Sequence, residues 1–142
     1  MTEPSHSPAT RVVALGREPR APGAQVGAPL VLTSTYHADG ATNYARVGNP
    51  TWSAFEEVLG DLEGGDALVF ASGLAAVDAA LSLVPVRGVV VAPSAAYNGV
   101  MVTLAEREAA GALSVRRVPI TDTAAVVAAL DGADLLLSLI HI

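Results

Sequence analysis

The chain has 142 residues, of which 51% are hydrophobic and 15% charged, so it is long enough to bury one apolar core. Its formal net charge of −6 argues against a surface that binds nucleic acid, and the lack of cysteine excludes disulfides and thiolate metal sites. No apolar run approaches the roughly 20 residues of a membrane span. We therefore expect a cytoplasmic protein that binds neither nucleic acid nor membrane.

The first third of the chain predicts little regular structure. Residues 1–8 are rich in proline and serine and predict a disordered tail, and a short helix is expected over residues 10–15. Residues 17–41 are rich in glycine and proline, which indicates a long loop. His37 and Asp39 lie in this loop, but without a third ligand nearby they do not predict a metal site.

A helix is predicted after the block NYARVGNPT at residues 43–51. Asn49 or Thr51 can cap its N-terminus, and Pro50 is tolerated in the first turn. The Gly-Gly pair at residues 64–65 ends it. Four apolar residues recur at helical spacing and form one face: Phe55, Val58, Leu59 and Leu62.

The block ALVFASGLAA at residues 67–76 is the centre of the pattern. It predicts a buried strand over residues 67–71 that runs into a helix beginning at Ser72 or Gly73. The start of such a helix leaves backbone N–H groups unpaired, and these donors suit a phosphate. Gly73 has no side chain to exclude an anion, and Ser72 offers a hydroxyl and an N-cap. An ordinary capped turn is the alternative, because α/β folds contain many such turns.

The rest of the chain alternates apolar segments with helical ones. Helices are expected to about residue 83, over 100–110 and from Thr121 or Asp122 to 130, and strands over 88–92, over 114–118 and from 134 onward. With the segment at 67–71 this gives four strands, each apolar throughout, and predicts a parallel sheet with helices on both faces. Loops after the strands share one edge, where such sheets bind ligands.

Four blocks now stand in order: YARVGNPT at residues 44–51, LEGG at 62–65, FASGLAA at 70–76 and YNG at 97–99. In order and spacing they resemble the Cys/Met-metabolism family of pyridoxal-phosphate enzymes, which includes cystathionine γ-synthase and cystathionine γ-lyase. The resemblance covers roughly residues 10–136. It implies part of the large domain of the aspartate aminotransferase-like fold (fold type I), preceded by an extended N-terminal arm. It also implies a homodimer or homotetramer that acts on an amino-acid substrate.

The resemblance implies a phosphate site for pyridoxal 5'-phosphate. The backbone N–H groups of Gly73 and Leu74, with Ser72, hold the phosphate at the helix start. Tyr44 and Arg46 reach across a dimer interface to the phosphate of the partner subunit, a task that suits a guanidinium. The alternative for Arg46 is a solvated loop arginine.

Tyr97 resembles the family tyrosine that stacks on the pyridine ring, where its hydroxyl also assists proton movement. Its alternative is a half-buried tyrosine at the end of a strand. Two departures from the family pattern make the subfamily harder to assign. Trp52 stands where many relatives have arginine, and Tyr97 is followed by Asn-Gly instead of the commoner Gly-Gly.

The last six residues depart further from the family. Relatives continue with an aspartate for the pyridine nitrogen and with the Schiff-base lysine, whereas this chain contains no lysine and ends in LSLIHI at residues 137–142. We hypothesise that this hexapeptide is translated sequencing-adapter DNA. The expected organisation is an N-terminal arm and dimer-contact segment over residues 1–48, a partial cofactor-binding α/β domain over 49–136, and the adapter-derived segment.

The sequence therefore predicts the N-terminal part of a carbon–sulfur lyase or transferase. The expected reaction is γ-elimination or γ-replacement on cystathionine or O-acylhomoserine-type substrates, and we expect the isolated chain to be inactive. The alternative is a non-catalytic module that binds a phosphate ligand or a partner protein. A nucleotide-binding domain is a weaker prediction, because no G-x-G-x-x-G follows a strand.

Overall fold

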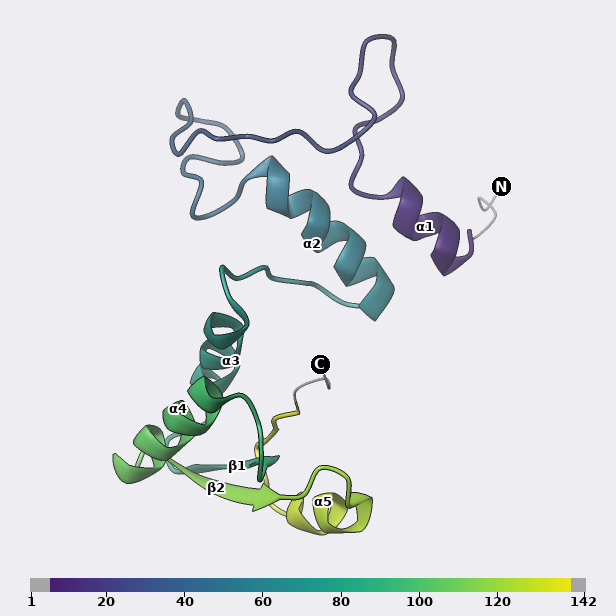
Figure 1. Cartoon of the computed structure of the whole chain (residues 1–142). Helices are drawn as coiled ribbons and strands as arrows, with labels where there is room; N and C mark the ends of the chain where they lie inside the picture. Colours follow the sequence, from purple (N-terminus) through teal and green to yellow (C-terminus); the bar gives the residue numbers. More distant parts are fainter. Residues whose placement is uncertain (1–5, 139–142) are drawn as a thin grey trace. The chain divides into compact units, whose positions relative to one another are not determined.

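The computed structural model describes residues 6–138 of the chain. These residues fall into two compact units that divide between Val69 and Phe70. We call them the N-terminal unit and the C-terminal unit and describe each by itself (Figure 1). The expected boundary after residue 48 stays a prediction. None of the described helices is long and apolar enough to cross a lipid bilayer.

The N-terminal unit contains two helices, α1 (Pro8–Ala14) and α2 (Pro50–Glu63). α1 begins two residues before its predicted start. It packs against α2, and Arg11 Nε donates a hydrogen bond to Asp61 Oδ2 at 2.8 Å. α2 ends at Gly64, as predicted, because the φ of 72° at that residue lies in the left-handed region that favours glycine.

Asn49 caps α2, as predicted, and also fixes the preceding loop. Its Oδ1 accepts from the backbone N–H of Thr51 at 2.8 Å, and its Nδ2 donates to the carbonyl of Val31 at 3.1 Å. The Thr51 hydroxyl accepts from the backbone N–H of Val31 at 2.8 Å and donates to the carbonyl of Pro29 at 3.0 Å. Because Asn49 is only 3% exposed, these bonds replace water as its partners.

The apolar face predicted on α2 is only partly covered within this unit. Val58 and Leu59 are half-buried, but Phe55 and Leu62 are exposed. α1, the helix that packs against α2, has 7 residues and α2 has 14, so α1 is too short to cover the whole length of α2. The periodicity predicted the helix correctly without determining how much of its face is buried.

The C-terminal unit alternates helices with strands. In chain order its elements are α3 (Gly73–Ser82), β1 (Gly88–Pro93), α4 (Asn98–Ala109), β2 (Leu113–Val118), α5 (Thr123–Ala129) and β3 (Leu135–Leu136). The strands form a parallel sheet in the order β2-β1-β3, with Gly88 opposite Leu113 and Val90 opposite Leu135. This arrangement confirms the predicted α/β class.

The two helices that connect the strands lie on opposite faces of the sheet. From β1 to β2 the chain moves one way across the sheet, and from β2 to β3 it moves back past β1. Right-handed crossovers therefore place α4 on one face and α5 on the other, as Figure 1 shows. Because α3 packs against α4, both lie on the same face.

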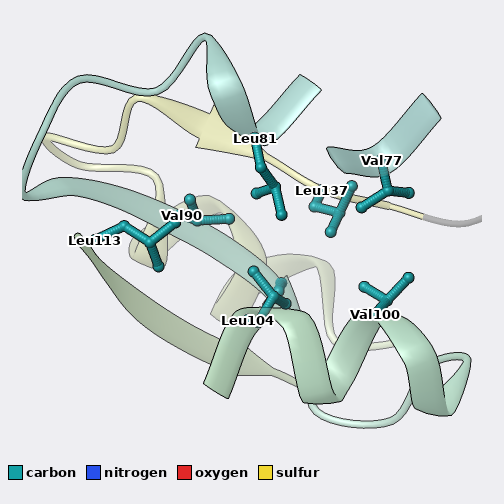
Figure 2. Packing of buried hydrophobic residues seen from close by; sticks show 8 residues of the cluster. Val77, Leu81, Val90, Val100, Leu104, Leu113 and Leu137 are labelled. Carbon is teal, nitrogen blue, oxygen red and sulfur yellow. The ribbon is translucent and has the colours of Figure 1, made fainter. Parts of the chain in front are cut away.

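The apolar core lies between the sheet and the helices α3 and α4. Figure 2 shows Val100 and Leu104 of α4 facing Val77 and Leu81 of α3. The other buried members are Val90, Ala92, Leu113 and Leu137. Burial of each large aliphatic side chain stabilises the fold by about 1.5–3 kcal/mol, so this cluster supports the elements that carry the predicted site.

The predicted buried strand at Ala67–Ala71 is not present. This segment has no regular secondary structure, and Leu68 is 76% exposed. A strand needs a neighbour for its backbone hydrogen bonds, and no described strand pairs with this segment. Within residues 6–138 the sheet therefore has three strands instead of four.

β2 also differs from its prediction as a strand that is apolar throughout. Ser114, Arg116 and Arg117 are exposed on this strand, which lies at one side of the sheet. Nη1 of Arg116 donates to the carbonyls of Ala129 and Asp131, at the C-terminus of α5. The strand thus uses its polar residues to join a neighbouring helix.

The strand predicted from Asp134 onward is confirmed as β3. The Asp134 carboxylate accepts from the backbone N–H of Val89 at 2.7 Å, and the backbone N–H of Leu137 donates to the carbonyl of Val91 at 2.8 Å. Leu137 is therefore part of the core, although it opens the segment that we attributed to adapter DNA. That attribution stays a hypothesis about the nucleotide sequence, and residues 139–142 lie outside the described residues.

Candidate functional site

The N-terminus of α3 presents two backbone donors. The Ser72 hydroxyl accepts from the backbone N–H of Ala75 at 3.2 Å, and the Ser72 carbonyl accepts from Ala76 at 3.1 Å. Among residues 6–138, no acceptor bonds the backbone N–H groups of Gly73 or Leu74. These two donors lie at the positive end of a ten-residue helix and suit an anion.

The space beside these donors is open. A side chain at Gly73 would meet no heavy atom within 4 Å, and Ser72 and Gly73 are both exposed. An anion can therefore approach the two N–H groups without displacing a neighbouring side chain. The sequence had predicted an N-cap by Ser72 and a helix beginning at Ser72 or Gly73. The structure confirms the cap and starts the helix at Gly73.

Tyr97 lies at the start of α4, after the carboxyl end of β1. It is the N-cap residue of that helix, but its side chain makes no capping hydrogen bond, and it is 66% exposed. A methyl group at Gly99 would lie 2.8 Å from Tyr97 Cε1 and 3.2 Å from Leu74 Cδ2. The side chains of Tyr97 and Leu74 therefore converge on Gly99, so the predicted ring-stacking residue lies close to the start of α3.

Tyr44 and Arg46 form a separate group in the N-terminal unit. The Arg46 guanidinium lies 5.0 Å from the centroid of the Tyr44 ring, which is cation–π geometry. Tyr44 also pairs with Thr35 in an isolated antiparallel bridge. Three other arginines hold carboxylates instead: Arg11, Arg107 and Arg117. The Arg46 side chain contacts a ring, and the ion pairs of the described residues do not involve it.

Metal ligands do not gather in the described part of the chain. Residues 6–138 contain no cluster of three or more histidine, aspartate or glutamate side chains with the spacing of a metal site. His37 and Asp39 are both exposed loop residues. The chemistry available at the α3 N-terminus is therefore that of backbone donors, a hydroxyl and an aromatic ring.

Sequence reasoning missed Gly99 as part of this site. Gly99 entered the sequence analysis only as part of the YNG block and of a departure from a commoner Gly-Gly pair. Nothing in the sequence indicated that Leu74 would reach residue 99. The available signal was a glycine in the first turn of a helix, a position where glycine is a poor helix former.

Comparisons with known proteins place these features in context. A family model described as Cys/Met metabolism PLP-dependent enzyme matches residues 9–136. A cystathionine beta-lyase of Lactococcus lactis is 40% identical over 80 residues, which cover 52% of this chain and 21% of that protein. A cystathionine gamma-synthase of Mycobacterium bovis is 40% identical over 100 residues, which cover 65% of this chain and 26% of that protein.

A solved structure shares the fold over nearly the whole chain. The crystal structure of cystathionine gamma-synthase from Xanthomonas oryzae pv. oryzae in complex with cystathionine matches with a TM-score of 0.80 and 26% identity. The match covers 94% of this chain and 36% of that one. The chain thus spans about a quarter of the length of the curated relatives and about a third of the solved structure.

Proposed function

Because this chain belongs to the family of Cys/Met metabolism PLP-dependent enzymes, we propose that it is the N-terminal part of a carbon–sulfur lyase or transferase. The proposed substrates are amino acids of the cystathionine or O-acylhomoserine type, and the proposed reaction is γ-elimination or γ-replacement. As the resemblance implies, the parent enzyme is a cytoplasmic homodimer or homotetramer. The match to both a beta-lyase and a gamma-synthase supports the substrate class more strongly than the choice of reaction.

The observation that carries this proposal is the pair of unpaired N–H groups at Gly73 and Leu74. They lie beside an open space that a side chain at residue 73 would fill, so the residues present fit a phosphate group. Tyr97 is in the same unit, and its exposed ring is free to stack on a flat aromatic ligand. A phosphate and an aromatic ring on one small ligand is the combination that pyridoxal phosphate offers.

Each residue has a proposed role toward that ligand. When bound, pyridoxal phosphate supplies an electron sink for charge that develops on the substrate carbon atoms. Gly73 and Leu74 donate to the phosphate, and Tyr97 packs against the ring and holds a proton on its hydroxyl. Tyr44 and Arg46 would together reach the phosphate of a partner subunit, a group that suits a planar guanidinium.

The chain cannot supply a lysine amine, because all eight of its basic residues are arginines. We therefore propose that the isolated 142-residue chain does not turn over cystathionine. Incubating purified chain with pyridoxal phosphate and cystathionine tests this, with heat-treated chain as the blank. Product above the blank would contradict the proposal.

The site itself is tested by equilibrium dialysis. We expect the chain to bind pyridoxal phosphate more tightly than pyridoxal, which lacks the phosphate. We expect Gly73→Val to lower the affinity for pyridoxal phosphate at least tenfold, because the valine side chain fills the open space. Ala76→Val is the matched control, because it adds a valine at an exposed position on the same helix. Equal affinity for the two ligands, or an unchanged affinity in Gly73→Val, would remove the phosphate site from the proposal.

The second candidate is a module that binds a phosphate ligand without catalysis, and the same unpaired N–H groups at Gly73 and Leu74 support it. Reading the source DNA beyond the codon for Leu136 separates the two. An intact frame that encodes a downstream lysine and aspartate supports the enzyme, whereas an authentic stop codon supports the module. Adapter sequence at residues 137–142 would be recognised in the same reading.

A further inference from the structure

We propose that Gly99 is a positioning residue for Tyr97: its lack of a side chain lets the tyrosine ring lie against the backbone of α4, next to Leu74. This inference rests on the proposed function, because it concerns the ring that would pack against the aromatic part of the ligand. It gives Gly99 a role in the site and explains how the Tyr97 ring keeps a fixed position relative to the phosphate donors.

The close approach is the first observation. A methyl group at residue 99 would lie 2.8 Å from Tyr97 Cε1, 3.4 Å from Tyr97 Cδ1 and 3.2 Å from Leu74 Cδ2. Carbon atoms that are not bonded pack at about 3.5–4.0 Å. Any side chain at this position therefore displaces the Tyr97 ring, the Leu74 side chain or both.

The backbone gives no other reason for a glycine here. Gly99 is in the first turn of α4, and its φ is not in the positive range that favours glycine. Alanine is a better helix former than glycine, so helix stability alone would favour alanine at this position. The space occupied by the ring of Tyr97 is what requires a residue without a side chain.

The consequence is a link between the two halves of the site. Leu74 supplies one of the phosphate donors through its backbone, and its side chain reaches the same point on α4 as the ring of Tyr97. A ring held there has a fixed position relative to the N-terminus of α3. We infer that Gly99 sets the affinity for the aromatic part of a ligand without affecting the affinity for its phosphate.

Gly99→Ala tests the inference through two ligands, pyridoxal phosphate and inorganic phosphate. We expect the variant to bind pyridoxal phosphate about three- to tenfold more weakly, the range for a lost aromatic contact. Its affinity for inorganic phosphate and its melting temperature should not fall. The inference would be overturned if the affinities for both ligands fell equally, or if neither affinity fell. Gly65→Ala is the control, because residue 65 has open space around it and a φ outside the positive range.

A double-variant cycle separates positioning from an effect on folding. If Gly99 acts through Tyr97, then Tyr97→Ala/Gly99→Ala binds pyridoxal phosphate no more weakly than Tyr97→Ala alone. A further loss in the double variant would overturn the inference, because it would show that alanine at residue 99 acts independently of the ring.

A measurement without ligand covers the case in which the chain binds no pyridoxal phosphate. Nuclear Overhauser contacts between the Tyr97 ring and the Leu74 methyl groups should be detectable in the native chain and lost or weakened in Gly99→Ala. Unchanged contacts would overturn the positioning role. Failure of the native chain to bind pyridoxal phosphate, with these contacts present, would instead count against the proposed function alone.

Discussion

The two units of this chain are stabilised by different means. In the described residues every buried apolar side chain lies in the C-terminal unit, between Val77 and Leu137. The N-terminal unit buries Asn49 and the backbone of Gly60, and it exposes large apolar residues, including Val26, Leu30, Leu32 and Val47. Its order depends on polar contacts between side chains and backbone.

This difference matches the division of the predicted site. The phosphate donors and Tyr97 belong to the unit with an apolar core, which fixes their geometry without help from a ligand. Tyr44 and Arg46 belong to the unit held by polar contacts, where the stacked pair is exposed. We therefore expect substitutions elsewhere in the chain to leave the geometry of the phosphate donors and Tyr97 unchanged. The geometry of Tyr44 and Arg46 should be more sensitive to such substitutions.

The largest effect should come from the core of the C-terminal unit. Leu104 is fully buried, so Leu104→Ala should lower the free energy of unfolding by about 2–5 kcal/mol. Val102→Ala, on the exposed side of the same helix, should stay within about 0.5 kcal/mol of the native chain. Urea denaturation followed by circular dichroism measures both, and equal losses would contradict the assignment of this core.

A smaller loss is expected from the polar network of the N-terminal unit. Asn49→Ala removes a cap and leaves half-buried backbone groups of Val31 and Thr51 unpaired, which should cost about 1–3 kcal/mol. Trp52 is the single tryptophan and lies in the first turn of α2, so its fluorescence reports on this unit. Asn43→Ala, at an exposed loop position, is the control. If Leu104→Ala shifted the Trp52 transition as much as Asn49→Ala does, the two units could not be treated as separately stabilised.

Acid should weaken one polar contact of the C-terminal unit. The backbone N–H of Val115 donates to the Glu108 carboxylate at 2.9 Å, and Arg117 bonds it as well, so both lower the pKa of Glu108. A lowered pKa means that this contact stabilises the fold above the ordinary glutamate value of about 4.3 and is lost as the pH falls through the folded value. Melting temperatures of the native chain and Glu108→Gln should therefore converge at acid pH. A constant difference across the acid range would exclude this contribution.

The smallest expected effect concerns the stacked pair in the N-terminal unit. Tyr44→Phe keeps the ring and should leave the Arg46 side-chain resonances nearly unchanged, whereas Tyr44→Leu should move them and cost about 0.5–1 kcal/mol, as expected for an exposed cation–π contact. Heteronuclear NMR of the Arg46 guanidinium measures this. Equal changes in the two variants would show that the hydroxyl, and not the ring, orients Arg46.

Local patterns predicted most elements of the chain. Three predicted features depend only on residues within one or two turns of each other: the cap at Asn49, the start of α3 and the strand over residues 88–92. The local sequence therefore contains the information that predicts them. The strand predicted at Ala67–Ala71 failed because an apolar run indicates only that a strand is favourable. Whether it forms depends on a neighbour, and no described strand pairs with this segment.

Long-range contacts account for what else the sequence could not predict. The approach of Tyr97 and Leu74 at Gly99 joins two helices, and the bonds from Arg116 to the end of α5 join a strand to a helix that follows it. Neither contact has a local signature. The phosphate donors were predictable as a type of turn, but their availability depends on the absence of neighbouring acceptors, which is a property of the folded chain.

The identity of the phosphate-binding groups is decided by an amide titration. The ¹⁵N-labelled chain is titrated with pyridoxal phosphate, and the two-dimensional spectrum is followed at each step. We predict that the N–H resonances of Gly73 and Leu74 shift most, move towards the values expected for donors to an anion, and stay shifted when excess inorganic phosphate displaces pyridoxal phosphate, because free phosphate binds the same two donors. Shifts confined to other residues, with Gly73 and Leu74 unmoved at saturation, would contradict a phosphate site at the start of α3.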